Sequence, residues 1–443
     1  MRDIAVTVAV LGALPFILKR PWFGIIVWTW LGFMNPHRMA WGFSTNMPFA
    51  YMVALVTLVA MLFSNEQKRI PWERESIVLF AFVGWMFITT IFAVFPELAW
   101  EQFEKVAKIQ IMIFVAMILI TTPDRLKYLV WIIVSSIAFY GIKGGIFTIA
   151  HGGVYRGEGP AGTFISGNNE LGLAMAMTVP LLYFSSRTIR NAWGKAAIHG
   201  ATVLTALAAI GTQSRGAMLG MAAMALMFWL KARNKFLIAI LGGLTLLLIV
   251  LIMPETWTAR MNTIETYDQD QSAMGRINAW WMAFNLAKDR FTGGGFETFQ
   301  AAMFNLYAPN PNDARDVHSI YFEVLGEHGF VGLGLFLLLL FFTWNSARSL
   351  RRIPPPSVDF YFINDLLLMT QVSLVAYLVA GAFLGMAYFD YPYNLVLIVI
   401  SIKAMYRSMG CYPYNSASSA FLKTESAIPF KSSRRATDFR RPM

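Results

Sequence analysis

A histidine stands where a charged segment gives way to a long apolar run. The stretch DVHSIYFEVLGEHGFVGLGLF covers residues 316–336, and His318 is its third residue. An imidazole titrates near neutral pH, so it can take a proton from a reacting hydroxyl group. His318 is therefore a candidate general base.

Four arginines stand on what we predict to be the same side of a membrane as this histidine: Arg156, Arg215, Arg276 and Arg290. Arginine stays charged, so it holds anions and does not move protons. Arg215 is the clearest case, because GTQSRGAML forms a short polar turn between two apolar runs. A helix predicted to begin at about residue 217 points its free N–H groups at the same place. A base beside an anion site suits transfer of a group from a phosphate-linked donor.

Arg215, Arg276 and Arg290 also have ordinary structural interpretations. Arg215 could extend its charge to the membrane surface. Arg276 opposes the dipole of its predicted helix by about 0.3–1 kcal/mol, unless it pairs with Asp270. Arg290 follows a polar helix end, and Arg156 lies in a glycine-rich loop that would let backbone approach a ligand.

Two short motifs do not support a cofactor or metal function. Residues 157–162 spell GxGxxG, but they follow no predicted strand and contain Pro160, so a dinucleotide fold is not expected. Asp268 and Asp270 spell DxD, which arises often by chance. No His, Cys and carboxylate cluster has the spacing of a metal site. We expect no cofactor, no metal and, with the single cysteine Cys411, no intrachain disulfide.

The elements that carry these residues are predicted to be membrane helices. The 443 residues are 57% hydrophobic and only 14% charged, and apolar runs recur along the chain. Because lipid offers no partner for backbone polar groups, the spans should be helical. The sequence predicts an all-α polytopic membrane protein with about twelve spans. The runs cover 4–18, 22–34, 48–63, 76–95, 106–121, 126–149, 168–186, 196–211, 216–230, 236–253, 319–344, 363–385 and 394–406.

Basic loops give the expected orientation. They occupy 68–74, 125–127, 187–195, 231–235 and 348–352, and by the positive-inside rule they should be cytoplasmic. The net charge of +11 is therefore attributed to topology and to the basic tail, and no nucleic acid is expected as a partner. We divide the chain into transmembrane helices over 1–253, a lid loop over 254–318 on the far side, further transmembrane helices over 319–406, and a cytoplasmic basic tail over 407–443.

Helical periodicity predicts which residues share a face in two of the expected helices. In the lid loop, Ile277, Trp280, Trp281 and Phe284 should share one face of an amphipathic helix on the membrane surface. In the following span, His318, Phe322, Leu325, Gly329 and Gly332 should share another, and its glycines would admit a neighbouring helix.

These motifs resemble those of one family. His318-Ser319, nine residues and Gly329-Phe330-Val331-Gly332 resemble the H[NSQ]-x9-GxxG signature of bacterial O-antigen ligases (WaaL), within the Wzy/ligase superfamily. TQSRGAMLG, GRINAWW…FTGGGFETF and RGEGPAGTFISGNNELGLAMAM…P resemble further segments of that superfamily, in the same order over about 150–335. The N-terminal third resembles the exosortase-associated O-glycosylation ligases. The chain departs from the pattern at Arg290-Phe291, where relatives commonly have His or Asn before Pro.

The resemblance implies a metal-independent, inverting glycosyltransferase with a GT-C-like helical fold. Its donor would be a glycan on undecaprenyl diphosphate, and its acceptor a sugar hydroxyl of lipid A-core, at the periplasmic face of the inner membrane. His318 would be the base, and Arg215 and Arg276 would bind the diphosphate, with Arg156 and Arg290 as further candidates. A Wzy-type polymerase and a protein O-oligosaccharyltransferase remain alternatives. A lipid-linked glycan transporter fits less well, because transporters place polar groups at mid-membrane.

Overall fold

The computed structural model describes residues 1–231, 234–236, 240, 243 and 271–412. The described residues form fourteen α-helices, a few short 3₁₀ turns and no strand, which confirms the all-helical prediction. The helices are α1 Arg2–Lys19, α2 Pro21–Met34, α3 Phe49–Phe63, α4 Arg74–Ile91, α5 Pro96–Leu119, α6 Pro123–Ala150, α7 Asn168–Ser186, α8 Ala192–Gly211, α9 Arg215–Lys231, α12 Gln271–Asp289, α13 Ala301–Tyr307, α14 Ile320–Leu350, α15 Ile363–Ala380 and α16 Asp390–Ser408.

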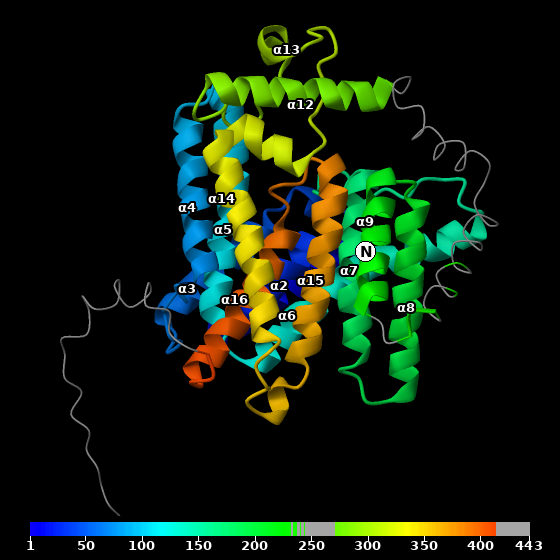
Figure 1. Ribbon diagram of the computed structural model, residues 1–443. Helices are drawn as coiled ribbons and strands as arrows, with labels where there is room; N and C mark the ends of the chain where they lie inside the picture. Colours follow the sequence, from blue (N-terminus) through cyan, green and yellow to red (C-terminus); the bar gives the residue numbers. More distant parts are fainter. Residues whose placement is uncertain (232–233, 237–239, 241–242, 244–270, 413–443) are drawn as a thin grey trace, which may run out of the picture.

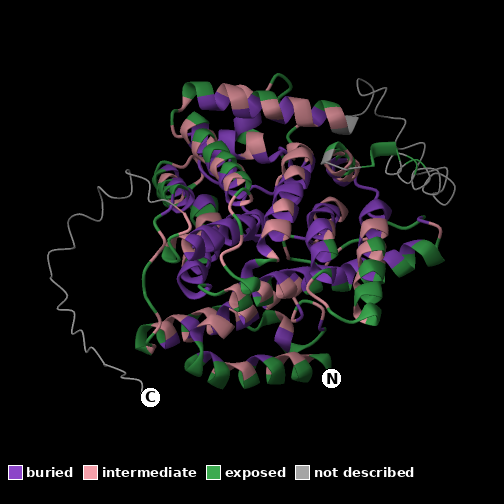
Figure 2. Cartoon of the chain, turned by 60° about the horizontal axis from the view of Figure 1, so that its bottom comes forward, coloured by how far each residue is buried: buried purple, intermediate pink, exposed green. Residues whose placement is uncertain are grey.

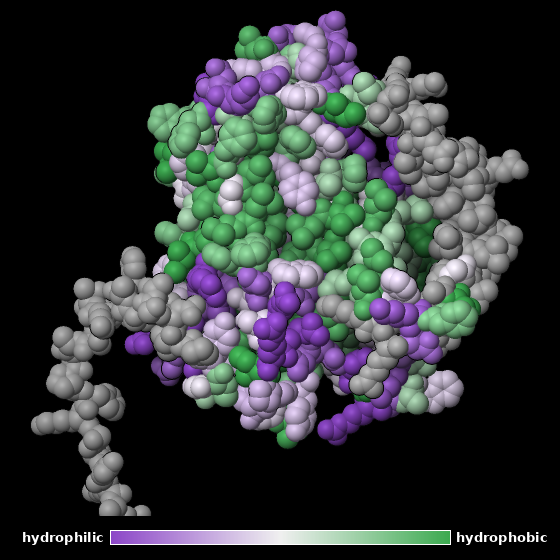
Figure 3. Space-filling model, viewed as in Figure 1, coloured by the Kyte–Doolittle hydropathy of each residue, from purple (hydrophilic) through white to green (hydrophobic). Residues whose placement is uncertain are grey.

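Apolar helices form an upright bundle with one helix lying across its end (Figure 1). In the described residues, the four helices α4, α6, α8 and α14, together with the segment 358–383 that includes α15, are long and apolar enough to cross a membrane. The helices α2, α3 and α9 are apolar but shorter. A hydrophobic band crosses the middle of the face seen in Figure 3, with hydrophilic atoms above and below it. The protein is therefore a membrane-embedded helical bundle, and twelve spans remain a prediction because most of 236–253 lies outside the described residues.

Cations of two predicted basic loops form ion pairs at one end of the bundle, which we call the basic end. Arg125 binds Glu66 with both guanidinium nitrogens at 2.6 and 3.0 Å, which joins the α3–α4 and α5–α6 connections. Arg187 binds Asp365 at 2.5 Å and joins the α7–α8 connection to the start of α15. These pairs place cations of two predicted basic loops at this end, as the positive-inside rule predicts for neighbouring loops.

The opposite end, the lid end, is covered by α12 and α13 (Figure 1). Met282 and Leu286 of α12 pack with Phe304 of α13 in a small apolar cluster. Asn278 Nδ2 donates to the carbonyl oxygens of Asn310 (2.8 Å) and Asp313 (3.1 Å), so the chain that returns to the bundle is tied to α12. The predicted amphipathic helix is present, but Trp281 is 51% exposed. The adjacent face of α12, with Ala279, Met282 and Ala283, is buried against the rest of the protein.

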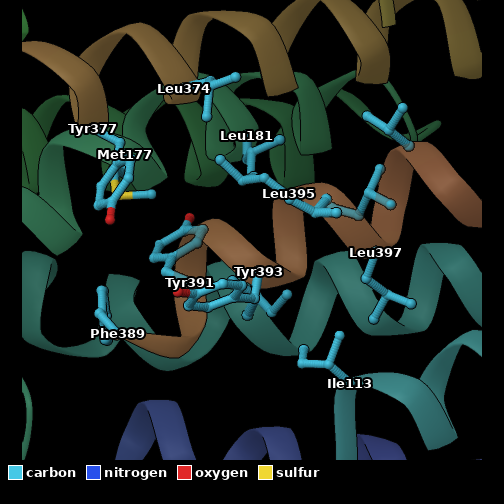
Figure 4. Close-up of a cluster of buried hydrophobic side chains, with 14 of the residues drawn as sticks. Ile113, Met177, Leu181, Leu374, Tyr377, Phe389, Tyr391, Tyr393, Leu395 and Leu397 are labelled. Carbon is cyan, nitrogen blue, oxygen red and sulfur yellow. The ribbon is translucent and has the colours of Figure 1, made fainter. Parts of the chain in front are cut away.

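The last helix lies at the centre of the bundle. Residues 390–403 are all buried, as are the neighbouring side chains Leu181 and Tyr377 (Figures 2 and 4). A helix that is apolar on every side is typical of a position with neighbours all round. Tyr391 completes its polar contact inside the protein, with its hydroxyl 3.0 Å from Thr178 Oγ1. The start of α16 is thus fixed to the middle of α7 in the interior of the bundle.

A network of buried ion pairs lies at the basic end. Lys403 is fully buried, and its Nζ lies 2.9 Å from Glu75 Oε2 and 3.2 Å from Glu73 Oε2. Arg407 also pairs with Glu73, and the Ser346 hydroxyl donates to Glu75. The network joins α4, α14 and α16, and such mutual pairing is what buried charges need. It fits a structural clamp better than a transport path.

Candidate functional site

His318 lies at the junction of the lid and the bundle, directly before α14. Its Nδ1 is 3.3 Å from Oδ2 of Asp316, and its side chain is 36% exposed. Its φ is 43°, a left-handed conformation that histidine tolerates better than most residues. The carboxylate of Asp316 favours the tautomer with the proton on Nδ1, which leaves the lone pair of Nε2 for an incoming proton. This arrangement has the geometry of an oriented base.

Arg215 is the first residue of α9, and the polar turn before it is buried. Gln213 (φ 56°) donates from Nε2 to the carbonyl oxygen of Gly153 at 3.0 Å. Ser214 caps the helix, because its Oγ accepts from the backbone N–H of Ala217 at 3.2 Å. The turn is therefore rigid and holds the half-buried Arg215 at a helix N-terminus.

Arg276 lies on α12 one turn before Trp280, so both point from the same side of the helix. Trp280 stacks on Phe322 with ring centroids 5.1 Å apart, and its Nε1 donates to the carbonyl oxygen of Val317 at 2.9 Å. The half-buried Arg276 consequently faces the bundle near the start of α14. Asp270, its alternative partner, lies outside the described residues.

The three elements meet at the short 3₁₀ turn η4, Gly381–Phe383, which follows α15. A methyl group on Gly216 would lie 3.3 Å from the carbonyl oxygen of Ala380, so α9 begins directly against this turn. The ring of Trp280 is 6.4 Å from that of Phe383. A methyl group on Gly381 would lie 2.7 Å from Ile320 Cδ1, two residues beyond His318. Arg215, Arg276 and His318 are thus carried by elements that converge on η4.

Carboxylates surround the histidine side of this site. A methyl group on Gly385 would lie 3.4 Å from Asp316 Oδ2 and 3.7 Å from Glu323 Oε2, so the two carboxylates face one loop. Glu323 accepts from the backbone N–H of Ala387 at 2.9 Å. Sequence reasoning missed this group, because the 385–387 loop that gathers it is distant in the chain. The 385–387 loop therefore brings Glu323 near Asp316, the carboxylate beside His318.

A kink at Gly329 separates the start of α14 from its long second part. Gly329 has φ 65° and ψ −171°, and Figure 1 shows the bend beneath α12. The N–H groups of Gly294 and Gly295 donate at 2.9 Å to the carbonyl oxygens of Gly326 and Glu327, which the kink frees. The predicted continuous face from His318 to Gly332 was therefore wrong, since the helix axis changes direction at Gly329.

Below the kink, His328 is fully buried, with Nδ1 2.7 Å from Thr89 Oγ1 and its carbonyl oxygen accepting from Trp85 Nε1 at 2.8 Å. These contacts bind α14 to α4. His328 is enclosed by protein, so His318 is the histidine of this region that a substrate can reach.

The two further arginines are placed differently. Arg290 donates from Nε to Gly293 (3.1 Å) and from Nη2 to the carbonyl oxygen of Phe92 (2.9 Å), which fixes the glycine loop to the end of α4. Arg276 and Arg290 are also about 21 Å apart along α12, at 1.5 Å per residue. Arg156 is exposed, and its Nε lies 3.4 Å from Gln213 Oε1. Arg156 therefore contacts the turn before Arg215 through Gln213.

The GxGxxG motif does not lie between a strand and a helix in the described residues. The backbone of 157–162 forms a loop without a strand before it, and Gly159 N–H donates to the carbonyl oxygen of Ser166 at 3.0 Å. Across the described part of the chain, no group of three His, Cys, Asp or Glu side chains could hold a metal ion. Asp268 and Asp270 lie outside it.

The site falls within a segment with a known family pattern. Residues 200–337 match the O-antigen ligase family. This segment contains Arg215, Arg276, Arg290 and His318, and the match supports a place in the ligase and Wzy superfamily. Residues 1–188, which include Arg156, match a family of unknown function (DUF5935). No curated protein matches the chain. Of the elements that contact η4, the matched segment contains α9, α12 and the start of α14, whereas α15 lies outside it.

Proposed function

We propose that the protein is an inverting glycosyltransferase that moves a glycan from undecaprenyl diphosphate to a sugar hydroxyl of lipid A-core. It would act in the bacterial inner membrane, with the lid end in the periplasm and the C-terminus in the cytoplasm. The proposal is supported by the contacts that α9, α12 and α14 make with η4, because these elements carry Arg215, Arg276 and His318 and begin within the O-antigen ligase segment.

The bond changes assign a role to each side chain. The acceptor oxygen attacks the anomeric carbon on the face opposite the diphosphate, and the carbon–oxygen bond to phosphate breaks. Nε2 of His318 takes the hydroxyl proton as the new bond forms. The leaving undecaprenyl diphosphate keeps the bonding electrons, and Arg215 and Arg276 would stabilise its charge through charge-assisted hydrogen bonds. The products are the glycosylated acceptor with inverted configuration and undecaprenyl diphosphate, and His318 returns its proton to water.

Arg290 and Arg156 take other roles in this scheme. Arg290 would hold the glycine loop under the lid, since two of its donors already bind carbonyl oxygens. Arg156 belongs to a separate cavity, described below. The diphosphate contacts therefore come from Arg215 and Arg276.

The identity of the acceptor distinguishes the proposed ligase activity from the alternative activities. The gene would be expressed in a strain that lacks its own O-antigen ligase, and lipopolysaccharide would be separated on a gel. Transfer of glycan to lipid A-core supports the ligase. A longer lipid-linked glycan with unmodified lipid A-core indicates a polymerase, and glycan on protein indicates an oligosaccharyltransferase. Movement of lipid-linked glycan without transfer would indicate a transporter.

A further inference from the structure

A cavity opens beside the second half of α6, the part of the helix that leads toward the lid end. It has a volume of about 940 Å³ and lies between the start of α1, the 36–41 loop, the second half of α6 and the 156–160 loop. Thr212 from the turn before Arg215 forms part of its wall. Most of this wall comes from the segment that matches a family of unknown function.

Four cations from four different elements line the cavity: Arg2, Arg38, Lys143 and Arg156. Glu158 is the only acidic residue of the wall, and no ion pair joins it to these cations in the described part of the chain. Arg2 lies over the ring of Trp41 at 5.3 Å. Four cations beside a single carboxylate leave the wall with a net positive charge, so an anion of matching shape would be bound favourably.

Lys143 is the least expected member of this set. It lies seven residues before the end of α6, about 10 Å below the lid end, in a helix apolar enough to cross a membrane. A lysine at this depth extends toward the surface or pairs with an anion. Its position places positive charge at the level where a lipid headgroup meets its chains.

The remaining wall is apolar and continues onto the outer surface of α6. Ile146 and Phe147 line the cavity and are 56% and 41% exposed, while Leu171 and Met175 form its buried floor. A cationic upper part beside an apolar side wall complements an amphiphile that has phosphate at one end and hydrocarbon at the other.

Hydrogen bonds of Gln213 connect the cavity to the candidate site. Gln213 accepts from Arg156 at 3.4 Å and donates to Gly153 at 3.0 Å, and it lies two residues before Arg215. We propose that this cavity binds the phosphate groups of the acceptor glycolipid, and so forms the acceptor subsite beside the donor site at η4. The assignment rests on the proposed transferase function, because it takes the diphosphate of the donor to occupy Arg215 and Arg276.

The test combines direct binding with kinetics on the full-length protein in lipid nanodiscs. The probe is radiolabelled, phosphorylated lipid A-core, compared with the same lipid after enzymatic removal of its phosphates. The variant is Arg38→Gln with Lys143→Gln, both exposed side chains. Lys127→Gln is the matched control, because Lys127 lies at the other end of α6 and pairs with Asp124 at 3.1 Å. Thermal unfolding in detergent verifies that all variants fold.

We expect at least a tenfold loss of affinity for phosphorylated lipid in the double variant, since two charge-assisted contacts are removed. The control should bind like the wild type. The dephosphorylated lipid should bind both proteins equally weakly. In transfer assays the acceptor KM should rise at least tenfold, while the kcat and the affinity for undecaprenyl diphosphate change less than twofold.

Unchanged affinity of the double variant for phosphorylated lipid would overturn the proposal. The proposal would also be overturned if undecaprenyl phosphate displaced the labelled probe more strongly than unlabelled glycolipid did. The cavity would then bind the donor. Absence of transfer to any acceptor would refute the proposed function, whereas the binding comparison would still report on the cavity.

Discussion

Replacing Gly329 with alanine should disrupt both the fold and the candidate site. The backbone at φ 65° and ψ −171° is a conformation that essentially only glycine adopts, and an L-residue there costs of order 1–3 kcal/mol. The new methyl group would lie 2.4 Å from the carbonyl oxygen of Phe291, which is backbone and cannot rotate away. The glycine loop would have to move.

That movement would weaken the hydrogen bonds from Gly294 and Gly295 to α14, each worth about 0.5–1.5 kcal/mol. With the backbone strain, the total is about 2–6 kcal/mol. Because the kink orients the short helix that begins beside His318, turnover should fall as well as stability.

Gly334→Ala is the matched control. Gly334 lies on the same helix, and nothing stands within 4 Å of an added methyl group, so alanine should be neutral or stabilise by up to about 1 kcal/mol. The assays are thermal unfolding in mild detergent and glycan transfer with purified lipids. If Gly329→Ala melts and turns over like Gly334→Ala, the kink does not position the site and this reasoning fails.

Three further predictions test separate parts of the structure. Lys403→Met should lower the free energy of unfolding by about 3–5 kcal/mol, because it leaves buried carboxylates without their cation, whereas Lys127→Met should cost under about 1 kcal/mol; equal melting curves would contradict this. Lysine in place of Arg215 or Arg276 should lower transfer about 10- to 150-fold, since one ammonium lacks the planar two-point contact; full rescue would remove the diphosphate role. Transfer should persist in EDTA, and its loss with recovery on adding Mg²⁺ or Mn²⁺ would restore a metal mechanism.

The helices could be predicted well from the sequence, because length and apolarity are local properties. The expected runs at 48–63 and 126–149 correspond to α3 and α6 within about three residues. The turn before Arg215 was also predictable, since a polar tetrapeptide between two apolar runs has few alternatives. The resemblance to ligases supplied the roles proposed for His318 and the arginines, which the geometry accommodates.

Other features depend on residues that are distant in the chain. The bend at Gly329 follows from carbonyl groups that Gly294 and Gly295 satisfy, and glycine in a helical pattern does not by itself indicate a kink. Glu75 and Lys403 are 328 positions apart, so their buried pair left no local signal. The partners of Arg290 are backbone carbonyl oxygens, which no sequence pattern marks.

The most direct test of the central claim uses His318→Ala with purified protein, undecaprenyl diphosphate-linked glycan and lipid A-core. We predict that transfer falls to background while undecaprenyl diphosphate binds with nearly unchanged affinity, because Arg215 and Arg276 remain. Thermal unfolding should match the wild type within a few degrees, since His318 is partly exposed. Transfer at near wild-type rate by a folded His318→Ala protein would contradict the assignment of the general base and, with it, the proposed mechanism.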